Sequence, residues 1–370
     1  MHTQPISNLL EHEGMPARPA TVELNAWYQG YETGMAFCRL TRALSLEPGT
    51  KSEKEQRCLE QILDRHVAQL SGCRHLTLVD LGTGDGQKML MVIDALVRSG
   101  VDSIRYLPVD TNPYISRYAI LNILGGGKVA WSTEDAERLF GPLADDDRGA
   151  IADGNAVSLE SLVYLSRSWS ASADVLVRNA LTVPLAGADV DFFQNFFDVV
   201  SLAKQLKPGM RAFCLLGNTF GNYPAPERDA FLDAVHAGME PGDVFLLGVA
   251  VRPGAGPAYA EEVRMLEREY LAGEAFMRPG ADDPASTFHS RFDPASHCMI
   301  HTFERPDTTV QHMGYSVLFD PEALARDLTA TGFEVLAQEL YPPLEAKAPG
   351  CLTIIARKPV HTAGSIEHRR

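Results

Sequence analysis

The strongest constraint on the fold of this chain is the glycine-rich stretch TLVDLGTGDGQK at residues 77–88. Its apolar start predicts a short strand, its glycines predict a tight turn, and the segment MLMVIDALVRSG that follows predicts a helix. Parallel α/β sheets build nucleotide pockets from this unit, because bare backbone lies against the ligand and the helix start offers unpaired N–H groups. A tight turn that binds nothing is the alternative that this stretch alone leaves open.

The spacing of the glycines indicates which kind of nucleotide to expect. A dinucleotide site has the pattern G-x-G-x-x-G, whereas this chain has G-x-G-x-G at Gly82, Gly84 and Gly86, preceded by Asp80. The next predicted strand, IRYLPVD, ends at Asp110, where a carboxylate can accept hydrogen bonds from both hydroxyls of a ribose. Capping of the following helix is the alternative for Asp110. The combination resembles the S-adenosylmethionine (SAM) site of class I methyltransferases.

Length and composition limit the remaining choices. A chain of 370 residues forms one large domain or two, and predicted strands that alternate with helices and Pro-Gly stops indicate a mostly parallel, doubly wound sheet. Six cysteines without a C-x-x-C pair suit free thiols in a reducing cytoplasm. No apolar run is long enough to span a bilayer, and the start MHTQPISNLL lacks the pattern of a signal peptide. We therefore expect a cytoplasmic protein without a membrane partner.

The net charge of −15 bears on the kind of partner. A surface this acidic repels nucleic-acid phosphates, so we expect a small or cationic substrate and no nucleic acid. The histidines at 289, 297, 301 and 312 are not spaced with cysteines or carboxylates as metal ligands are, so we expect no metal site. The sequence gives no indication of the oligomeric state.

Several stretches together resemble one family, the ergothioneine-type L-histidine Nα-methyltransferases and their fungal relatives that methylate an amino-acid nitrogen. They lie between about residues 27 and 333 and are WYQGYETGMAFCRLT, VDLGTGDGQKMLMVIDAL, YLPVD, LLGNTFGNY followed by PGDVFLLGV, and YSVLF. The stretch LLGNTFGNY is the most specific, because class I methyltransferases in general lack a G-[NS]-T-x-G-N-[FY] turn after the fourth strand. The resemblance implies an α/β fold with a Rossmann-like class I methyltransferase sheet and a second, smaller α+β domain.

The resemblance also implies how the chain divides. Residues 1–66 would form an N-terminal arm and part of the second, substrate domain, and residues 67–251 the SAM-binding methyltransferase domain. Residues 252–315 would be an insertion that completes the second domain. Residues 316–370 would return to the methyltransferase sheet.

Site residues follow from the resemblance position by position. SAM-binding roles are implied for Asp80, Gly82, Gly84, Gly86, Lys88, Asp110, Asn179 and Asn218. Lys88 is expected near the SAM carboxylate and Asn179 near the adenine. On the substrate side the implied residues are Asn222, Tyr28 and Ser316, with Asn222 holding the amino and carboxylate groups of the substrate. From the residues alone, Asn222 could simply close a turn and Tyr28 could be a core aromatic.

Two departures from the family concern the substrate. In the histidine enzymes, a glutamate that binds the imidazole of the substrate lies two residues before the position of Ser316, and this chain has Gly314 there. In addition, the segment LSLEPGTKSEKE replaces a tyrosine-rich segment of the family. We therefore expect a SAM-dependent N-methyltransferase of specialised metabolism, acting on an amino acid or small amine other than histidine. Transfer to a guanidine or an oxygen is one alternative, motivated by the acidic helical segment 260–270, whose charges are otherwise a solvated face. A non-catalytic SAM-binding regulatory protein is the other.

Overall fold

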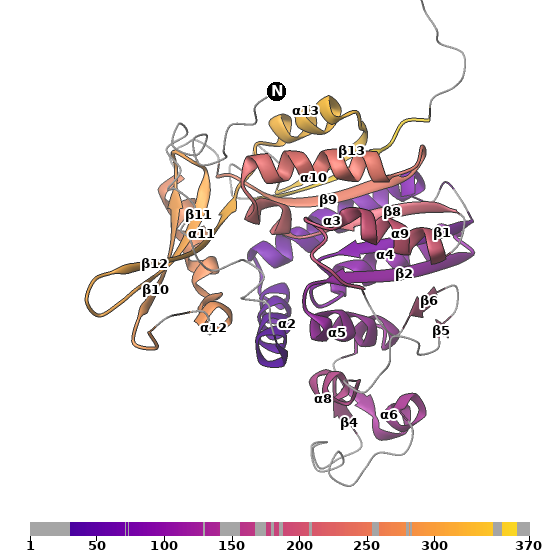
Figure 1. Cartoon of the computed structure of the whole chain (residues 1–370), viewed down its shortest axis with the longest axis horizontal. Helices are drawn as coiled ribbons and strands as arrows, with labels where there is room; N and C mark the ends of the chain where they lie inside the picture. The colour runs from indigo at the N-terminus through magenta and orange to yellow at the C-terminus, as the bar shows by residue number, and fades with distance from the viewer. Residues whose placement is uncertain are drawn as a thin grey trace, which may run out of the picture.

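A large sheet forms the centre of the protein (Figure 1). The computed structural model describes residues 30–70, 72, 74–128, 130–140, 156–166, 175–178, 181–184, 188–206, 209–253, 259–278, 281, 283–342 and 350–360. The strands of the large sheet are β1 (His75–Leu81), β2 (Ser103–Asp110), β5 (Val175–Arg178), β6 (Leu181–Pro184), β7 (Ala188–Asp189), β8 (Met210–Leu215), β9 (Val244–Val251), β13 (Glu334–Tyr341) and β14 (Gly350–Arg357). Their order is β13-β14-β9-β8-β1-β2-β6-β5, and β7 also pairs with β2.

The pairing of these strands confirms the predicted fold class. Strand β1 is parallel to both β2 and β8, and β8 is parallel to β9, whereas β14 runs antiparallel to β9 and to β13. The strand order reverses between β1 and β8, and in open α/β sheets ligands bind at the carboxyl ends of the strands at such a reversal. All eight residues of β9 are buried, as expected for a strand covered on both faces.

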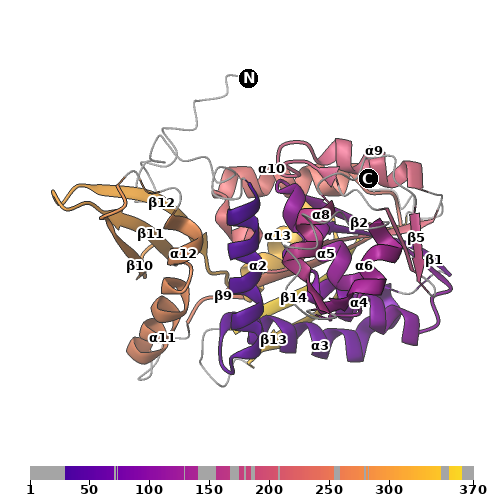
Figure 2. The same cartoon turned by 90° about the horizontal axis from the view of Figure 1, so that it is seen from below.

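Helices cover both faces of the large sheet (Figure 2). On one face lie α3 (Lys51–Leu70), α4 (Gln87–Arg98) and α5 (Pro113–Leu124), whose apolar residues share one buried core with β1 and β2. The other face is covered by α9 (Phe196–Leu206), α10 (Ala225–Gly238) and α13 (Pro321–Thr331). Helix α3 buries Leu59, Ile62 and Leu63, whose spacing places them on one side of the helix.

A smaller antiparallel sheet lies beside the large one and consists of β10 (Thr287–Asp293), β11 (Cys298–Glu304) and β12 (Val310–Val317). Helix α11 (Tyr259–Leu271) packs on it through an apolar cluster that includes Leu266 and Phe292. Helix α2 (Tyr31–Leu46) contacts the same sheet through Phe37 and Leu40, and α12 (Glu274–Met277) contributes Met277 to this contact.

A third group of elements packs against α2 and α5. It comprises β3 (Ala130–Ser132), α6 (Thr133–Phe140), β4 (Ala156–Ser158) and α8 (Leu159–Leu165), and the core that it shares with α2 and α5 includes Met35, Ile115 and Leu162. Helix α3, in contrast, shares its core with the large sheet although it begins within residues 1–66. The division of the chain into four parts stays a prediction.

Candidate active site

The glycine turn joins β1 to α4, as the sequence predicts. Gly82, Gly84 and Gly86 have φ values of 71°, 55° and 77°, in the left-handed region that favours glycine. A Cβ on Gly86 would lie 3.0 Å from the backbone of Ala119 in α5, so this glycine lets α4 and α5 approach each other. Gly82 and Gly84 line the cavity described next, whereas Gly86 is not among its lining residues.

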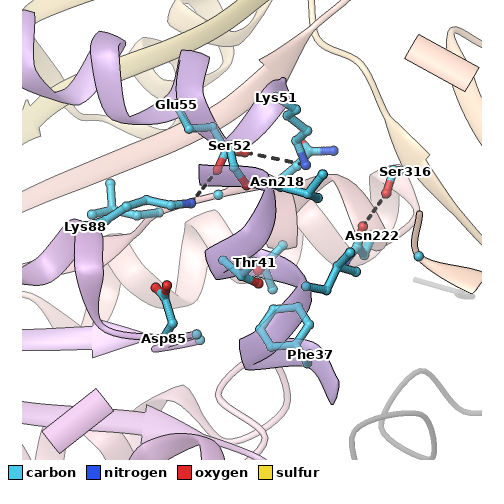
Figure 3. A pocket seen from close by; sticks show the side chains of 18 of the residues that line it. Phe37, Thr41, Lys51, Ser52, Glu55, Asp85, Lys88, Asn218, Asn222 and Ser316 are labelled. Carbon is cyan, nitrogen blue, oxygen red and sulfur yellow. Dashed lines mark hydrogen bonds and ion pairs between the residues drawn. The ribbon is translucent and has the colours of Figure 1, made fainter. Parts of the chain in front are cut away.

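A cavity of about 220 Å³ opens at the carboxyl ends of β1 and β8 (Figure 3). Its walls come from α2, α3, the glycine turn, α4 and the turn after β8, together with α11, α12, β11 and β12. The cavity therefore lies between the large sheet and the small one. It brings together the predicted residues Asp80, Gly82, Gly84, Lys88, Asn218, Asn222 and Ser316.

Two buried carboxyl groups lie near the glycine turn. The hydroxyl of Tyr106 donates to Asp80 across 2.8 Å, and burial raises the pKa of Asp80 to about 7. Asp110 accepts hydrogen bonds from the backbone N–H of Asn112 and the hydroxyl of Thr83, and burial raises its pKa to about 6. Asn112, not Asp110, is the N-cap of α5, so the capping alternative for Asp110 is wrong. Asp110 lies at the end of β2 but does not itself line the cavity.

An ion cluster that the sequence analysis did not identify occupies one wall. Lys88 pairs with Oε2 of Glu55, and the ammonium of Lys51 lies 3.5 Å from Oε1 of the same carboxylate. Burial opposes ionisation of Glu55, but the two lysines outweigh it and lower its pKa. The spacing of Lys51 and Glu55 by four residues, which places both on one side of α3, was the signal available in the sequence.

The turn after β8 is the short 3₁₀ helix η3 (Asn218–Asn222). Asn218 donates to the carbonyl of Val317 and accepts from the backbone N–H of Ala250, so both ends of its amide are occupied. The hydroxyl of Ser316 donates to Oδ1 of Asn222 across 2.7 Å. Asn222 therefore contacts β12 rather than merely closing its own turn. In the described part of the chain the amide nitrogen of Asn222 has no hydrogen-bond partner and is available to a ligand.

The small-sheet side of the cavity is formed in part by α11 and β11. Glu269 is half-buried, and burial raises its pKa to about 7. His301 is buried and bonded through Nδ1 to the hydroxyl of Ser290. Burial, reinforced by the charge of Lys51, lowers the pKa of His301 to about 3, so the imidazole is neutral at physiological pH. In the register of the small sheet, His301 stands between Ser290 on β10 and Gly314 on β12.

Some predictions fall elsewhere. Tyr28 and Asn179 lie outside the described residues. No group of three or more potential metal ligands occurs among the residues that the structure describes. Within the same residues, no helix is both long enough and apolar enough to cross a membrane.

Comparisons with known proteins agree with the motifs. The profile of a family described as histidine-specific, SAM-dependent methyltransferases matches residues 166–270. The histidine N-alpha-methyltransferase of Mycobacterium tuberculosis (strain CDC 1551 / Oshkosh) is 26% identical over 223 residues, which are 60% of this chain. The matched part spans about half, 49%, of that protein's length.

Two solved structures with low sequence identity also align with most of the chain. A SAM-dependent methyltransferase from Clostridium acetobutylicum ATCC 824 is 11% identical, with 89% of this chain and 98% of that chain covered and a TM-score of 0.36. The 1,6-didemethyltoxoflavin-N1-methyltransferase of Burkholderia thailandensis is also 11% identical, with 94% and 95% covered and a TM-score of 0.36. The family profile and the mycobacterial relative are the matches that bear on the class of the protein. The chain is thus similar in sequence to the histidine-specific, SAM-dependent methyltransferases, which confirms the resemblance, the enzyme class and the cofactor, SAM, that the motifs predict.

Proposed function

We propose that the protein transfers the methyl group of SAM to a nitrogen of an amino acid or small amine other than histidine. The observation that carries this proposal is the bonded pair Asn222 and Ser316 on the wall of a cavity that the glycine turn also lines. One cavity thus holds the expected cofactor residues and the expected acceptor residues together. A site that only binds SAM has no need of the second set.

The residues of the cavity fit SAM. Oδ2 of Asp85 is buried and has no hydrogen-bond partner in the described part of the chain. Asp85 lines the cavity, where the ammonium or a ribose hydroxyl of SAM can supply the missing donor. Lys88 would approach the carboxylate of SAM beside Glu55, and Asp110 would face its ribose. When bound, SAM supplies a methyl group activated by its sulfonium.

The protein itself must align and desolvate the acceptor. Alignment of two bound reactants supplies on the order of 7–11 kcal/mol of the barrier, so positioning groups account for much of the catalysis. Asn222 and Ser316 orient the acceptor, and the side chains of Phe37 and Tyr315 help to enclose the cavity. The acceptor nitrogen must be deprotonated before it can attack, because an ammonium has no lone pair.

The cellular context belongs to the same proposal. We infer a small-molecule substrate and a cytoplasmic location. Five cysteines in the described part of the chain, at positions 38, 58, 214, 298 and 351, are buried and free, as suits a reducing compartment.

Titration calorimetry tests the cofactor, and a coupled assay tests the reaction. SAM and S-adenosylhomocysteine are expected to bind, whereas NAD is expected to give no heat, because the glycine spacing is not that of a dinucleotide site. Incubation with SAM and a panel of amino acids should then release S-adenosylhomocysteine. Binding of NAD without a response to SAM would overturn the proposal.

A further inference from the structure

Glu269 is the acid that α11 directs into the active-site cavity. Two other acids of this helix have different partners: Glu261 is exposed and pairs with Arg264 across 3.1 Å, and Glu267 accepts the backbone N–H of Phe292 across 2.9 Å. Glu269, in contrast, lines the cavity together with the neighbouring Tyr270. Its Oε1 accepts the backbone N–H of Lys51.

The carboxylate of Glu269 lacks a cation of its own. No ammonium or guanidinium lies within 4.0 Å of it among the residues that the structure describes. The charges of Lys51 and Lys54 both act on Glu269, but the ammonium of Lys51 pairs with Glu55 and lies 5.3 Å from the centre of the Tyr270 ring. Lys88 pairs with Glu55 as well. Both lysines of the cavity therefore neutralise Glu55 and leave Glu269 without an ion pair.

The charges that line the cavity add up to an excess of acid. Glu55, Asp80, Asp85 and Glu269 are acidic, and the lysines at 51 and 88 are basic. Above the pKa of about 7 of Asp80 and of Glu269 all six groups are ionised, and the lining then carries −2, obtained as two positive charges minus four negative ones. SAM carries a net charge of +1, from its sulfonium and a zwitterionic end. A second cation in the cavity would balance the remainder.

We propose that the acceptor carries a second positive group, an ammonium or a guanidinium distinct from the nitrogen that is methylated, and that Glu269 binds it. This inference rests on the proposed function and names the substrate class of the same site. The histidine enzymes are expected to contact the acceptor side chain through a glutamate at the position of Gly314, which offers no carboxylate. In this protein Glu269 supplies a carboxylate from another element, and charge-assisted hydrogen bonds to it favour a cation.

The neighbours of Glu269 agree with this assignment. His301 is neutral at physiological pH and adds no positive charge that would repel a cation. The ammonium of Lys51 lies over the ring of Tyr270 in the same wall, and the charges of Lys51 and Lys54 favour the ionised form of Glu269. Burial raises the pKa of Glu269 to about 7, so the preference for a cation should grow as the pH rises through 7 and the carboxyl group ionises.

Matched pairs of amino acids test the inference. L-arginine is compared with L-citrulline, its neutral urea analogue, and L-lysine with L-norleucine, which lacks the terminal ammonium. Release of S-adenosylhomocysteine gives kcat and KM for each. In the wild-type protein the cationic member of at least one pair should have a kcat/KM at least about tenfold higher.

Variants assign that preference to Glu269. Glu269→Gln keeps an oxygen for the N–H of Lys51 but removes the charge, so the preference should fall below about twofold, mainly through a higher KM for the cationic member. Glu269→Asp should restore part of it. Glu261→Gln is the matched control: it removes one negative charge from an exposed position of the same helix and should leave the preference unchanged.

The outcomes separate this inference from the proposed function. Equal turnover of both members of each pair, or a preference that survives Glu269→Gln, overturns the inference. So does a SAM-binding protein that neither methylates L-arginine or L-lysine nor binds them by calorimetry when loaded with S-adenosylhomocysteine. A protein that binds neither SAM nor S-adenosylhomocysteine refutes the proposed function itself.

Discussion

Asn222 is the residue that most directly tests where the acceptor binds. Its Oδ1 is held by Ser316, and it lines the cavity at the end of the turn after β8. Asn222→Ala should lower turnover about ten- to hundredfold, because losing a hydrogen bond to a charged or reacting group costs roughly 1.5–3 kcal/mol. The Kd for SAM, measured by calorimetry, should change little.

Ser316→Ala provides the matched comparison for Asn222. This variant leaves the amide in place but removes the hydroxyl that orients it, so turnover should fall in the same direction and by less. Loss of SAM binding in Asn222→Ala would instead make this residue part of the cofactor site or of the fold. Normal turnover in both variants would place the acceptor elsewhere.

Asp110 is expected to contribute to cofactor binding through the ribose. Asp110→Ala should weaken SAM binding by about 1.5–3 kcal/mol, the range for hydrogen bonds to a charged group. The fold should survive, because α5 is capped by the side chain of Asn112 and not by that of Asp110. Calorimetry gives the Kd and circular dichroism checks the fold; an unchanged Kd would remove the ribose role.

The buried carboxyl of Asp80 should make stability depend on pH. Burial raises its pKa to about 7 in the folded protein, so its contribution to stability is present below the unfolded pKa of about 4 and is lost as the pH rises through 7. The substitution Asp80→Asn removes the ionisable carboxyl group, and with it the loss of stability at high pH. The Tm of the variant minus that of the wild type should therefore increase as the pH rises from about 4 to about 7 and level off at higher pH. A difference that does not vary with pH would contradict the assigned shift.

At the scale of elements, α3 links the fold to the site. It packs on the large sheet through its apolar side and places Glu55 between two lysines of the cavity. Glu55→Gln should reduce the free energy of unfolding by about 1–3 kcal/mol, since it leaves two ammonium groups without their shared partner. Because the pKa of Glu55 is lowered, the stabilisation is present above the unfolded pKa and is lost as the pH falls below it.

Urea denaturation at pH 7 and at pH 4 measures this difference. Glu60→Gln is the control, because Glu60 is an exposed member of the same helix that pairs with Arg57. If the control loses as much stability as Glu55→Gln, the ion pairs of Glu55 with Lys51 and Lys88 do not contribute more to stability than an exposed ion pair of the same helix.

The elements also show which predictions local patterns support. The glycine turn and the apolar runs of β1, β2, β8 and β9 are strong signals, and the structure contains each of them. The apolar run DVLVRNAL at 174–181 gives no sign that two antiparallel strands, β5 and β6, meet there. Strand β10 follows a segment rich in proline and glycine and has no continuous apolar run, so its sequence alone is a weak signal for a strand.

At the scale of the whole molecule, the proposed acceptor site is built from segments far apart in the sequence. Asn222 and Ser316 were predicted from the resemblance, and the structure places them in contact. Lys51, Glu55 and Glu269 were not predicted as site residues, because the pattern of a charged helix does not show which of its charges will be covered by another element. Their positions depend on how α3 and α11 meet the two sheets.

The same arrangement leads us to expect that L-histidine is a poor substrate. The imidazole N–H of the substrate would need an acceptor near Gly314, and the side chain opposite this glycine is the neutral His301. A site that offers no hydrogen-bond acceptor for the imidazole N–H loses much of its preference for histidine over other amino acids. We expect kcat/KM for histidine to be at least about tenfold below that for the preferred acceptor. Efficient conversion of histidine to its trimethyl betaine would refute this.

The bonds of Asn218 bear on how such a protein can change its substrate. Its amide fastens the backbone of β12 to that of β9, through Val317 and Ala250, at the point where the small sheet meets the large one. Asn218 thus holds β12 through the main chain of Val317, and these bonds do not depend on which residues stand at 314 and 316. If the proposed acceptor site is right, we expect substitutions at these two positions to change the acceptor while the cofactor half of the protein stays intact. Mutations that diversify β11 and β12 are thus a suitable library for engineering new acceptors, provided that Asn218 is left in place.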